Sequence, residues 1–206
     1  MLPRLECPFK TPDALAAGGW SDIPPVYLKE TVTGSAPRQS TWFKTAWSEY
    51  ALHVFFHSED TDAWATHTVR DAPLYDEEVV EIFFDPVGDL TSYFEIEVNP
   101  LNTVCDLVLR RVSSGWRKDF AWDCQGLRTL TNHQPHQTPA FWTVEMSIPF
   151  ASLGPDAHPS AGTSWRVNFF RIDRPKDSPW ELSAWSPTGI PLFHVQEKFG
   201  YLDFVR

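Results

Sequence analysis

The stretch from Arg70 to Asn99 limits the possible folds most strongly, because it contains two extended runs joined by turn residues. Residues 79–84 are mostly β-branched or aromatic, and residues 85–89 then supply Asp, Pro and Gly, which favour a turn. In residues 93–99 apolar and polar side chains alternate strictly, as they do on a strand with one packed face. The sequence therefore predicts an antiparallel hairpin.

Glu81 lies inside the first of these runs, between Val79 and Phe83 on one face of the predicted strand. A carboxylate in so apolar a strand needs a partner. It is either one half of a salt bridge to a buried arginine or an acceptor for a ligand, and perturbed acids occur in both settings. The sequence leaves both interpretations open.

Length and composition indicate one all-β domain that spans residues 1–206. The chain is 42% hydrophobic with ten Trp and fifteen Phe, too rich for a disordered chain, and eighteen Pro favour short strands over helices. About ten extended segments separated by turn signals predict an antiparallel β-sandwich of immunoglobulin-like or jelly-roll-like type.

The net charge argues against one class of partner, and the number and spacing of the cysteines argue against disulfide and zinc sites. A net charge of -10 argues against nucleic acid, whose binding depends on Lys and Arg. Three cysteines without CxxC spacing indicate neither a disulfide framework nor a zinc site. No segment has the length and apolarity of a signal peptide or a membrane span, so we expect a cytoplasmic protein, or a periplasmic or extracellular one if a leader is removed.

Several local motifs carry a chemical interpretation beside a structural one. His53 and His57 share a strand face but lie about 13 Å apart by strand rise, too far to chelate one metal. Met146 is a conceivable haem ligand, although packing in an amphipathic strand accounts for it. Asp85 and Asp89 are the candidate calcium ligands, with turn formation as the alternative. No cofactor is required by these motifs.

Two further segments are expected to be loops. Residues 113–126 carry three aromatic side chains, which we expect to cap the core rather than to meet a ligand. Residues 131–139 have low hydrophobicity and are expected to be solvated.

Seven segments carry a family resemblance, and they occur in the order RDAPLYDEEVVEIFFDP, YFEIEVNP, WTVEMSIPF, WRVNFFRI, AWSPTG, FH and KFGYLDF. Together they resemble the family 9 carbohydrate-binding modules, from about Trp42 to Phe204. The resemblance implies a DOMON-like β-sandwich of polysaccharide metabolism. Members of that family hold sugar ends between two aromatic side chains flanked by acids, amides and arginines.

The resemblance assigns roles to particular residues of this chain. Glu81 matches the family's acid and Asn99 its amide, while Tyr75 and Phe193 fall where sugar-binding members usually carry Trp. Glu97 stands where the family has an arginine. The scaffold is thus kept and the sugar clamp is altered.

A pyranose needs flat aromatic surface together with polar groups that replace water around the ring. We expect Tyr75 and Phe193 to stack on the sugar, and Glu81 and Asn99 to bond it, with micromolar to millimolar affinity. The remaining candidates are Trp180, which is the exposed aromatic of the late loop, and an arginine drawn from Arg70, Arg166 and above all Arg171. Arg171 has a structural alternative, a buried pair with Glu81 or Glu95.

The predicted function is non-catalytic carbohydrate binding, with a saccharide as the partner and neither nucleic acid nor membrane. The first alternative is a protein interaction module that has lost the sugar site and has a protein partner. A second is a glycoside hydrolase, because Glu95 and Glu97 share a strand face at roughly 7 Å, within the range of paired catalytic carboxylates.

Overall fold

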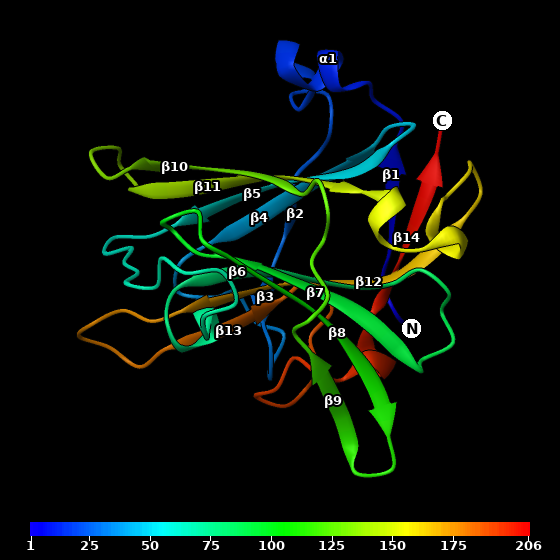
Figure 1. Ribbon diagram of the computed structural model, residues 1–206. Coiled ribbons are helices and arrows are strands. Elements are labelled where there is room, and N and C mark those ends of the chain that lie inside the picture. Colours follow the sequence, from blue (N-terminus) through cyan, green and yellow to red (C-terminus); the bar gives the residue numbers. More distant parts are fainter.

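Two β-sheets pack face to face in the computed structural model, which describes all residues 1–206 (Figure 1). The smaller sheet has the strand order β10 (Arg128–Gln134), β11 (Phe141–Pro149), β5 (Ala51–Glu59), β4 (Thr41–Trp47) and β2 (Val26–Tyr27). The larger sheet has the order β1 (Arg4–Pro8), β14 (Gly200–Val205), β12 (Ser164–Asp173), β6 (Val79–Asp85), β7 (Ser92–Val98), β8 (Val104–Val112) and β9 (Gly115–Asp119). Beside β12 it also carries β13 (Glu181–Ala184), which pairs with β3 (Lys29–Glu30). The predicted antiparallel β-sandwich is confirmed.

Helices are as scarce as the composition predicts. They are the short turns α1 (Pro12–Ala14), η1 (Leu15–Gly19), η2 (Leu74–Asp76), η3 (Phe150–Ser152), η4 (Pro155–Ala157) and η5 (Gln196–Lys198). None of them is long and apolar enough to cross a membrane.

The predicted hairpin is β6 and β7, and it lies in the middle of the larger sheet. Ile82 pairs with Ile96 on the face that packs against the smaller sheet, and Glu81 pairs with Glu97 on the outer face. The segment 85–89 makes the turn, with Gly88 at φ 76°. The alternation of the sequence therefore places one row of apolar side chains in the core and one row of acids on the opposite face.

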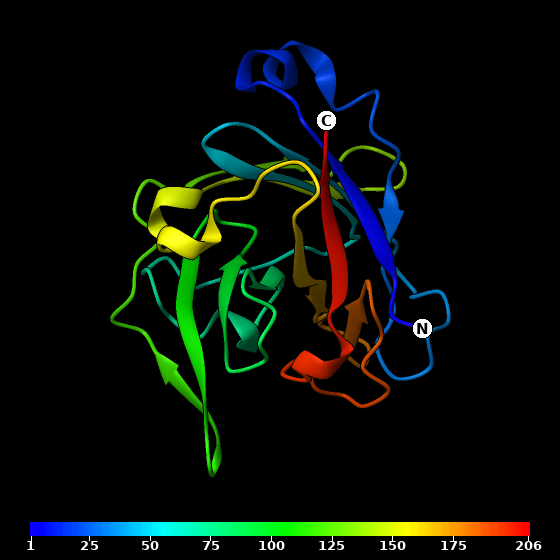
Figure 2. The same ribbon diagram turned by 90° about the vertical axis from the view of Figure 1, so that its right-hand side faces the viewer.

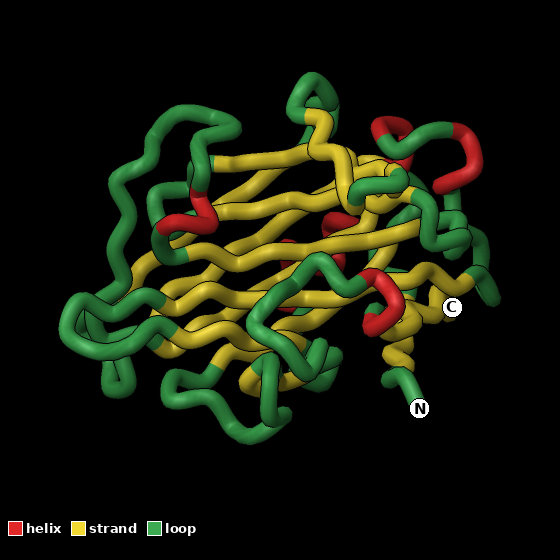
Figure 3. The backbone as a smooth tube through the Cα atoms, turned by 90° about the horizontal axis from the view of Figure 1, so that it is seen from below, coloured by secondary structure: helices red, strands yellow, loops and turns green.

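Both faces of the larger sheet are packed. Between the sheets lies a cluster of 26 buried residues, in which Phe43 and Phe169 stack with their ring centroids 3.8 Å apart. A second cluster of 12 residues covers part of the outer face and includes Phe83, Phe170 and Phe193. Loops and short helical turns cross this outer face when the molecule is seen from below (Figure 3). A partly covered outer face leaves room for a pocket between the loops.

Two segments expected to be loops contain strands, and with the further short strands β1 and β3 the sheets contain 14 strands rather than about ten. Residues 113–126 contain β9, and residues 131–134 belong to β10. Both strands form sheet edges and are mostly exposed, so neither has the apolar face that makes a strand visible in a sequence. Of the three aromatic residues expected to cap the core, Trp116 and Trp122 pack against the two clusters, whereas Phe120 is exposed.

The remaining local expectations hold. His57 stacks between Trp42 and Phe141, at centroid distances of 4.7 and 4.3 Å, and is structural as expected. The three cysteines are free and buried.

At one edge of the larger sheet the first and last strands, β1 and β14, run parallel and side by side (Figure 2).

Candidate functional site

A pocket of about 280 Å³ opens on the outer face of the larger sheet, and we call it the Tyr75 pocket. It collects the predicted ligand residues Tyr75, Glu81, Trp180 and Phe193 from four separate parts of the chain. The other lining residues are Asp76, Phe83, Glu95, Lys118, Ile172, Arg174, Leu182, Pro191, Leu192 and His194. Aromatic, acidic and basic side chains therefore meet in one concavity.

The floor of the pocket is acidic. Glu81 of β6 and Glu95 of β7 line it, and Glu97 is the cross-strand neighbour of Glu81. All three carboxyl groups are buried. Burial raises their pKa, and the negative charge of the neighbouring acids raises the pKa of Glu81 and Glu97 further. The floor therefore retains protons at pH values where exposed carboxyl groups are ionised.

The rim carries two cations, each next to an aromatic ring. The ammonium nitrogen of Lys118 lies 5.0 Å from the centroid of the Tyr75 ring. The guanidinium of Arg174 lies 3.8 Å from the centroid of the Trp180 ring, and its Nη2 donates to the carbonyl oxygen of Tyr75 at 2.9 Å. Cations at these distances are attracted to the ring faces and fix the aromatic side chains. Sequence reasoning missed both, because Lys118 lies on the unpredicted strand β9 and Arg174 directly follows β12.

The two predicted clamp residues have unequal roles. Tyr75 is 37% exposed and offers ring surface to the pocket, whereas Phe193 is 7% exposed and stacks on Phe170 at 4.2 Å. Phe193 is thus a wall of the pocket rather than a free platform. Trp180, 55% exposed, is the second open aromatic surface. The expected clamp of Tyr75 with Phe193 is corrected to exposed rings of Tyr75 and Trp180 above a wall formed by Phe193.

Asn99 lies outside the pocket. It is fully buried at the end of β7, where its amide donates to the carbonyl oxygen of His67 at 2.9 Å. Its carbonyl oxygen accepts from the backbone N–H groups of Leu101 and Thr103. All of its polar groups serve the turn between β7 and β8, so the prediction that Asn99 bonds a ligand in this pocket is wrong.

Arg171 faces the opposite side of the sheet. Its neighbours Phe170 and Ile172 belong to the outer cluster, so the alternation of β12 turns Arg171 between the sheets. There its Nη2 donates to Asp60 at 2.7 Å, and Nη1 donates to the carbonyl oxygen of Glu59 at 2.7 Å. Arg171 is a buried structural cation, and its assignment as a ligand residue is wrong. Its partners also differ from the Glu81 or Glu95 expected for the structural alternative.

The other candidate arginines are engaged in structural contacts. Arg70 pairs with Asp106 and Asp123, at 2.5 and 2.9 Å. Arg166 donates to the carbonyl oxygen of Phe199 at 2.8 Å and so fastens the loop before β14. Neither lines the Tyr75 pocket, and the arginine that does is Arg174.

The candidate calcium ligands serve the turn that contains them. Asp85 accepts hydrogen bonds from the backbone N–H groups of Val87, Gly88 and Leu90. Asp89 accepts from the backbone and hydroxyl of Thr91. These contacts match the turn-forming alternative and leave Asp85 little capacity for a cation.

Two other groups of acids bring their oxygens within 4.8 Å of one another, Asp60 with Glu78 and Asp173, and Asp71 with Asp106 and Asp123. Each group already contains a guanidinium, that of Arg171 in the first and that of Arg70 in the second. Glu78 in the first group has its pKa raised to about 9 by burial, against the lowering effect of Arg171. Both groups are therefore ion-pair networks, in which an arginine side chain occupies the place that a metal ion would take.

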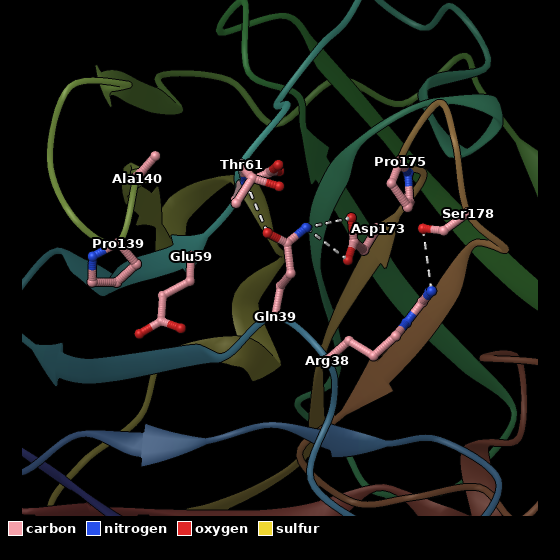
Figure 4. Close-up of a pocket in the computed structure, with 10 residues that line it drawn as sticks. Arg38, Gln39, Glu59, Thr61, Pro139, Ala140, Asp173, Pro175 and Ser178 are labelled. Carbon is pink, nitrogen blue, oxygen red and sulfur yellow. Dashed lines mark hydrogen bonds between the residues drawn. The ribbon is translucent and has the colours of Figure 1, made fainter.

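A second hollow, of about 340 Å³, lies at the end of the sandwich (Figure 4). It is lined mainly by polar side chains and contains no aromatic ring. Its polar groups are largely paired with one another, as Figure 4 shows for Gln39 with Asp173 and for Arg38 with Ser178. This hollow lacks the flat apolar surface that a sugar ring requires.

Met146, the conceivable haem ligand, is buried in the core between the sheets, where packing accounts for it.

Solved structures from Bacteroides uniformis and Caldicellulosiruptor kristjanssonii have the same fold. A putative carbohydrate-binding protein from Bacteroides uniformis matches with a TM-score of 0.77 and 17% identity, covering 99% of this chain and 100% of that one. A family 9 carbohydrate-binding module from Caldicellulosiruptor kristjanssonii in complex with cellotriose matches with a TM-score of 0.72 and 18% identity, covering 98% of this chain and 94% of that one. A family 9 carbohydrate-binding module from the same organism in complex with glucose matches with a TM-score of 0.69 and 18% identity, covering 99% of this chain and 97% of that one. At such identities these matches establish the fold.

Family membership rests on the sequence comparison. No curated protein sequence matches this chain. The sequence model of the family described as "Carbohydrate-binding family 9" matches residues 33–204. Because that match spans most of the chain and agrees with the fold, the protein belongs to carbohydrate-binding family 9.

Proposed function

We propose that the Tyr75 pocket binds a saccharide and that the domain does so without cleaving it. The observation that carries this proposal is the meeting of two exposed aromatic rings, Tyr75 and Trp180, with buried acids below them. Membership in carbohydrate-binding family 9 and the glucose and cellotriose complexes of the related module support it.

The chemistry of the pocket suits a sugar ring. The C–H faces of a pyranose pack on the rings of Tyr75 and Trp180, and its hydroxyl groups exchange water for Glu81, Glu95 and Arg174. Each aromatic contact contributes about 0.5 to 1.5 kcal/mol beyond the buried area. Because the two rings are partly exposed and do not enclose the sugar, we expect dissociation constants between about 1 µM and 1 mM.

Binding without hydrolysis fits the position of the acids. A glycoside hydrolase needs two carboxyl groups that both reach the scissile bond. Glu97 is 1% exposed and does not line the pocket, so the pair of Glu95 with Glu97 cannot flank a substrate. Glu81 and Glu95 do line the pocket, but burial raises the pKa of both, whereas a hydrolase places its two carboxyl groups in environments that push their pKa values apart.

The test is calorimetric titration with glucose, cellobiose and cellotriose up to millimolar concentration. We expect saturable heats that weaken in a Tyr75→Ala variant and stay unchanged in Tyr50→Ala, which removes an exposed tyrosine from the turn between β4 and β5. No heat with any saccharide, including those of a glycan array, would refute the proposal. That result would favour the alternative of a protein interaction module.

A further inference from the structure

The floor of the Tyr75 pocket contains three carboxyl groups, none of which has a lysine or arginine nitrogen within 4.0 Å. Glu81 and Glu97 are directly opposite in the register of β6 and β7, and Glu95 follows on the same face. Like charges opposite one another across two strands destabilise a sheet. Such an arrangement calls for a compensating group.

The protein itself supplies no direct partner for several of these oxygens. Oε1 of Glu81 is buried without a hydrogen bond to the protein, and Oε2 of Glu95 and both carboxyl oxygens of Glu97 have no N–H or hydroxyl donor. Glu95 and Glu97 have only a hydrogen bond to each other, which requires a shared proton. A buried acceptor left without a donor costs about 1 to 3 kcal/mol. Glu81 and Glu95 line the pocket, so a ligand held there lies next to these two side chains.

The nearest basic groups do not fill this role. Lys118 is exposed and makes no ion pair within 4.0 Å with any of the three acids. Nδ1 of His194 lies 3.8 Å from Oε2 of Glu95, beyond hydrogen-bonding distance. Burial, and then the charge of Lys118, lowers the pKa of His194 to about 4, so this imidazole is neutral at pH 7. Arg174 is directed to Tyr75 and Trp180 instead.

Two kinds of ligand fit this floor less well. A bound metal ion needs several oxygens converging within a few ångströms, and these three glutamates are not among the acid groups whose oxygens lie within 4.8 Å of one another. A neutral hydroxyl group donates one hydrogen bond and brings no positive charge next to the acids. A primary ammonium group donates three hydrogen bonds and brings the positive charge that favours ionised carboxylates.

We propose that the preferred ligand of the Tyr75 pocket is a saccharide bearing a protonated amino group, a 2-amino-2-deoxy sugar for example, with its ammonium group on Glu81 and Glu95. This inference rests on the proposed function and names the ligand class of the same pocket. The sugar ring contacts Tyr75 and Trp180, as any pyranose would. The charged nitrogen is what distinguishes the favoured ligand from glucose.

The proposal has a thermodynamic signature besides affinity. The raised pKa values of Glu81 and Glu95 mean that part of the floor is protonated in the free protein. A bound ammonium group favours the ionised carboxylates, so protons leave the floor when the amino sugar binds. Glucose carries no charge and gives no such release. Calorimetry in two buffers of different ionisation enthalpy measures the number of protons released.

The experiment compares glucose, glucosamine and N-acetylglucosamine at about pH 6, where the amino group of glucosamine is charged. We expect glucosamine to bind about tenfold or more tighter than glucose, as hydrogen bonds to charged groups imply, and with proton release. Acetylation removes the charge and should remove both effects. Glu81→Gln and Glu95→Gln keep the shape of the floor and should reduce the preference, while Glu6→Gln on exposed strand β1 should leave it unchanged.

The outcomes separate the two proposals. If glucose and glucosamine bind equally well and neither releases protons, the amino-sugar proposal is wrong and saccharide binding stands. If no sugar binds, both proposals fail. If the preference persists in both glutamine variants, each checked for native folding by circular dichroism, the assigned contact is wrong.

Discussion

The ammonium group of Lys118 lies over the ring of Tyr75, 5.0 Å from its centroid. The two residues belong to different parts of the fold, since Lys118 lies on the edge strand β9 and Tyr75 on the short turn η2. The cation lies over one ring face, and Tyr75 as a whole remains 37% exposed. Strand β9, which was not predicted from the sequence, therefore orients Tyr75, which was predicted as a ligand residue.

Replacing Tyr75 by tryptophan should strengthen saccharide binding. The indole buries more apolar surface than the phenol ring and interacts more strongly with cations such as Lys118. We expect the dissociation constant for glucose to fall about two- to tenfold, which corresponds to about 0.5 to 1.4 kcal/mol. Calorimetric titration checks this, with Tyr50→Trp as the control at an exposed tyrosine remote from the pocket. Unchanged affinity in Tyr75→Trp would argue that the ring does not touch the sugar.

Removing the Trp180 ring should weaken binding without unfolding the protein. Trp180 is 55% exposed, so Trp180→Ala removes a ligand surface and little of the core. We expect an affinity loss of about three- to tenfold for cellotriose. The midpoint of urea unfolding should remain nearly constant. Leu130→Ala, on the exposed edge strand β10, is the control for loss of an exposed apolar side chain.

Arg171 should matter for stability and not for ligand recognition. Arg171→Met leaves Asp60, Glu78 and Asp173 without their buried cation, and breaking a buried pair of this kind costs about 3 to 5 kcal/mol. Urea unfolding at pH 7 should show this loss, while Arg4→Met, which breaks the exposed pair with Asp203, should cost about 1 kcal/mol or less. If native Arg171→Met lost saccharide affinity selectively, the assignment of Arg171 to the interior would be contradicted.

Glu97 should make the stability of the protein depend on pH. Its pKa in the folded state lies well above its ordinary value of 4.5, because of burial and then of the charges of Glu81 and Glu95. Its contribution is therefore fully present below about pH 4.5 and is lost as the pH rises toward the folded-state pKa, because the unfolded chain ionises more readily. Glu97→Gln should stabilise the protein more at pH 8 than at pH 5. Thermal unfolding across this range checks it, and an identical pH profile in the variant would contradict it.

Calcium should leave the stability of the turn at 85–89 unchanged. Asp85 already accepts three backbone N–H groups and the amide of Gln196 at 2.9 Å. We expect the same unfolding temperature with calcium and with a chelator. Asp85→Ala should cost about 1 to 3 kcal/mol, because three backbone N–H groups of the turn and the amide of Gln196 then lose their acceptor. A rise of several degrees on addition of calcium would instead support the metal interpretation.

The fold was predictable because the decisive strands have a distinct pattern. The alternation of β7 predicts which side chains face the core, and it also places Glu95 and Glu97 together on the outer face. The edge strands β9 and β10 were not predictable, since exposure on both faces leaves no apolar periodicity to detect.

The site was predictable only in part, for two physical reasons. Phe169 and Phe170 are both apolar although they face opposite sides of β12, so the sequence does not show on which side Arg171 lies. The rim cations Lys118 and Arg174 meet Tyr75 and Trp180 through contacts between distant segments, which no local pattern encodes. Acids on a regular strand were thus identified, whereas the cations next to the aromatic rings were not.

The central position of β6, between β12 and β7 and with packed clusters on both faces, divides the site into parts that differ in mobility. Backbone amides of Glu81 and Glu95 should exchange with deuterium only when the whole domain unfolds, whereas those of the loop around Trp180 should exchange through local opening. The acids then keep a fixed position, and they select ligands by charge. The loop that carries Trp180 can move, so the aromatic rim can adapt to ligands of different shape.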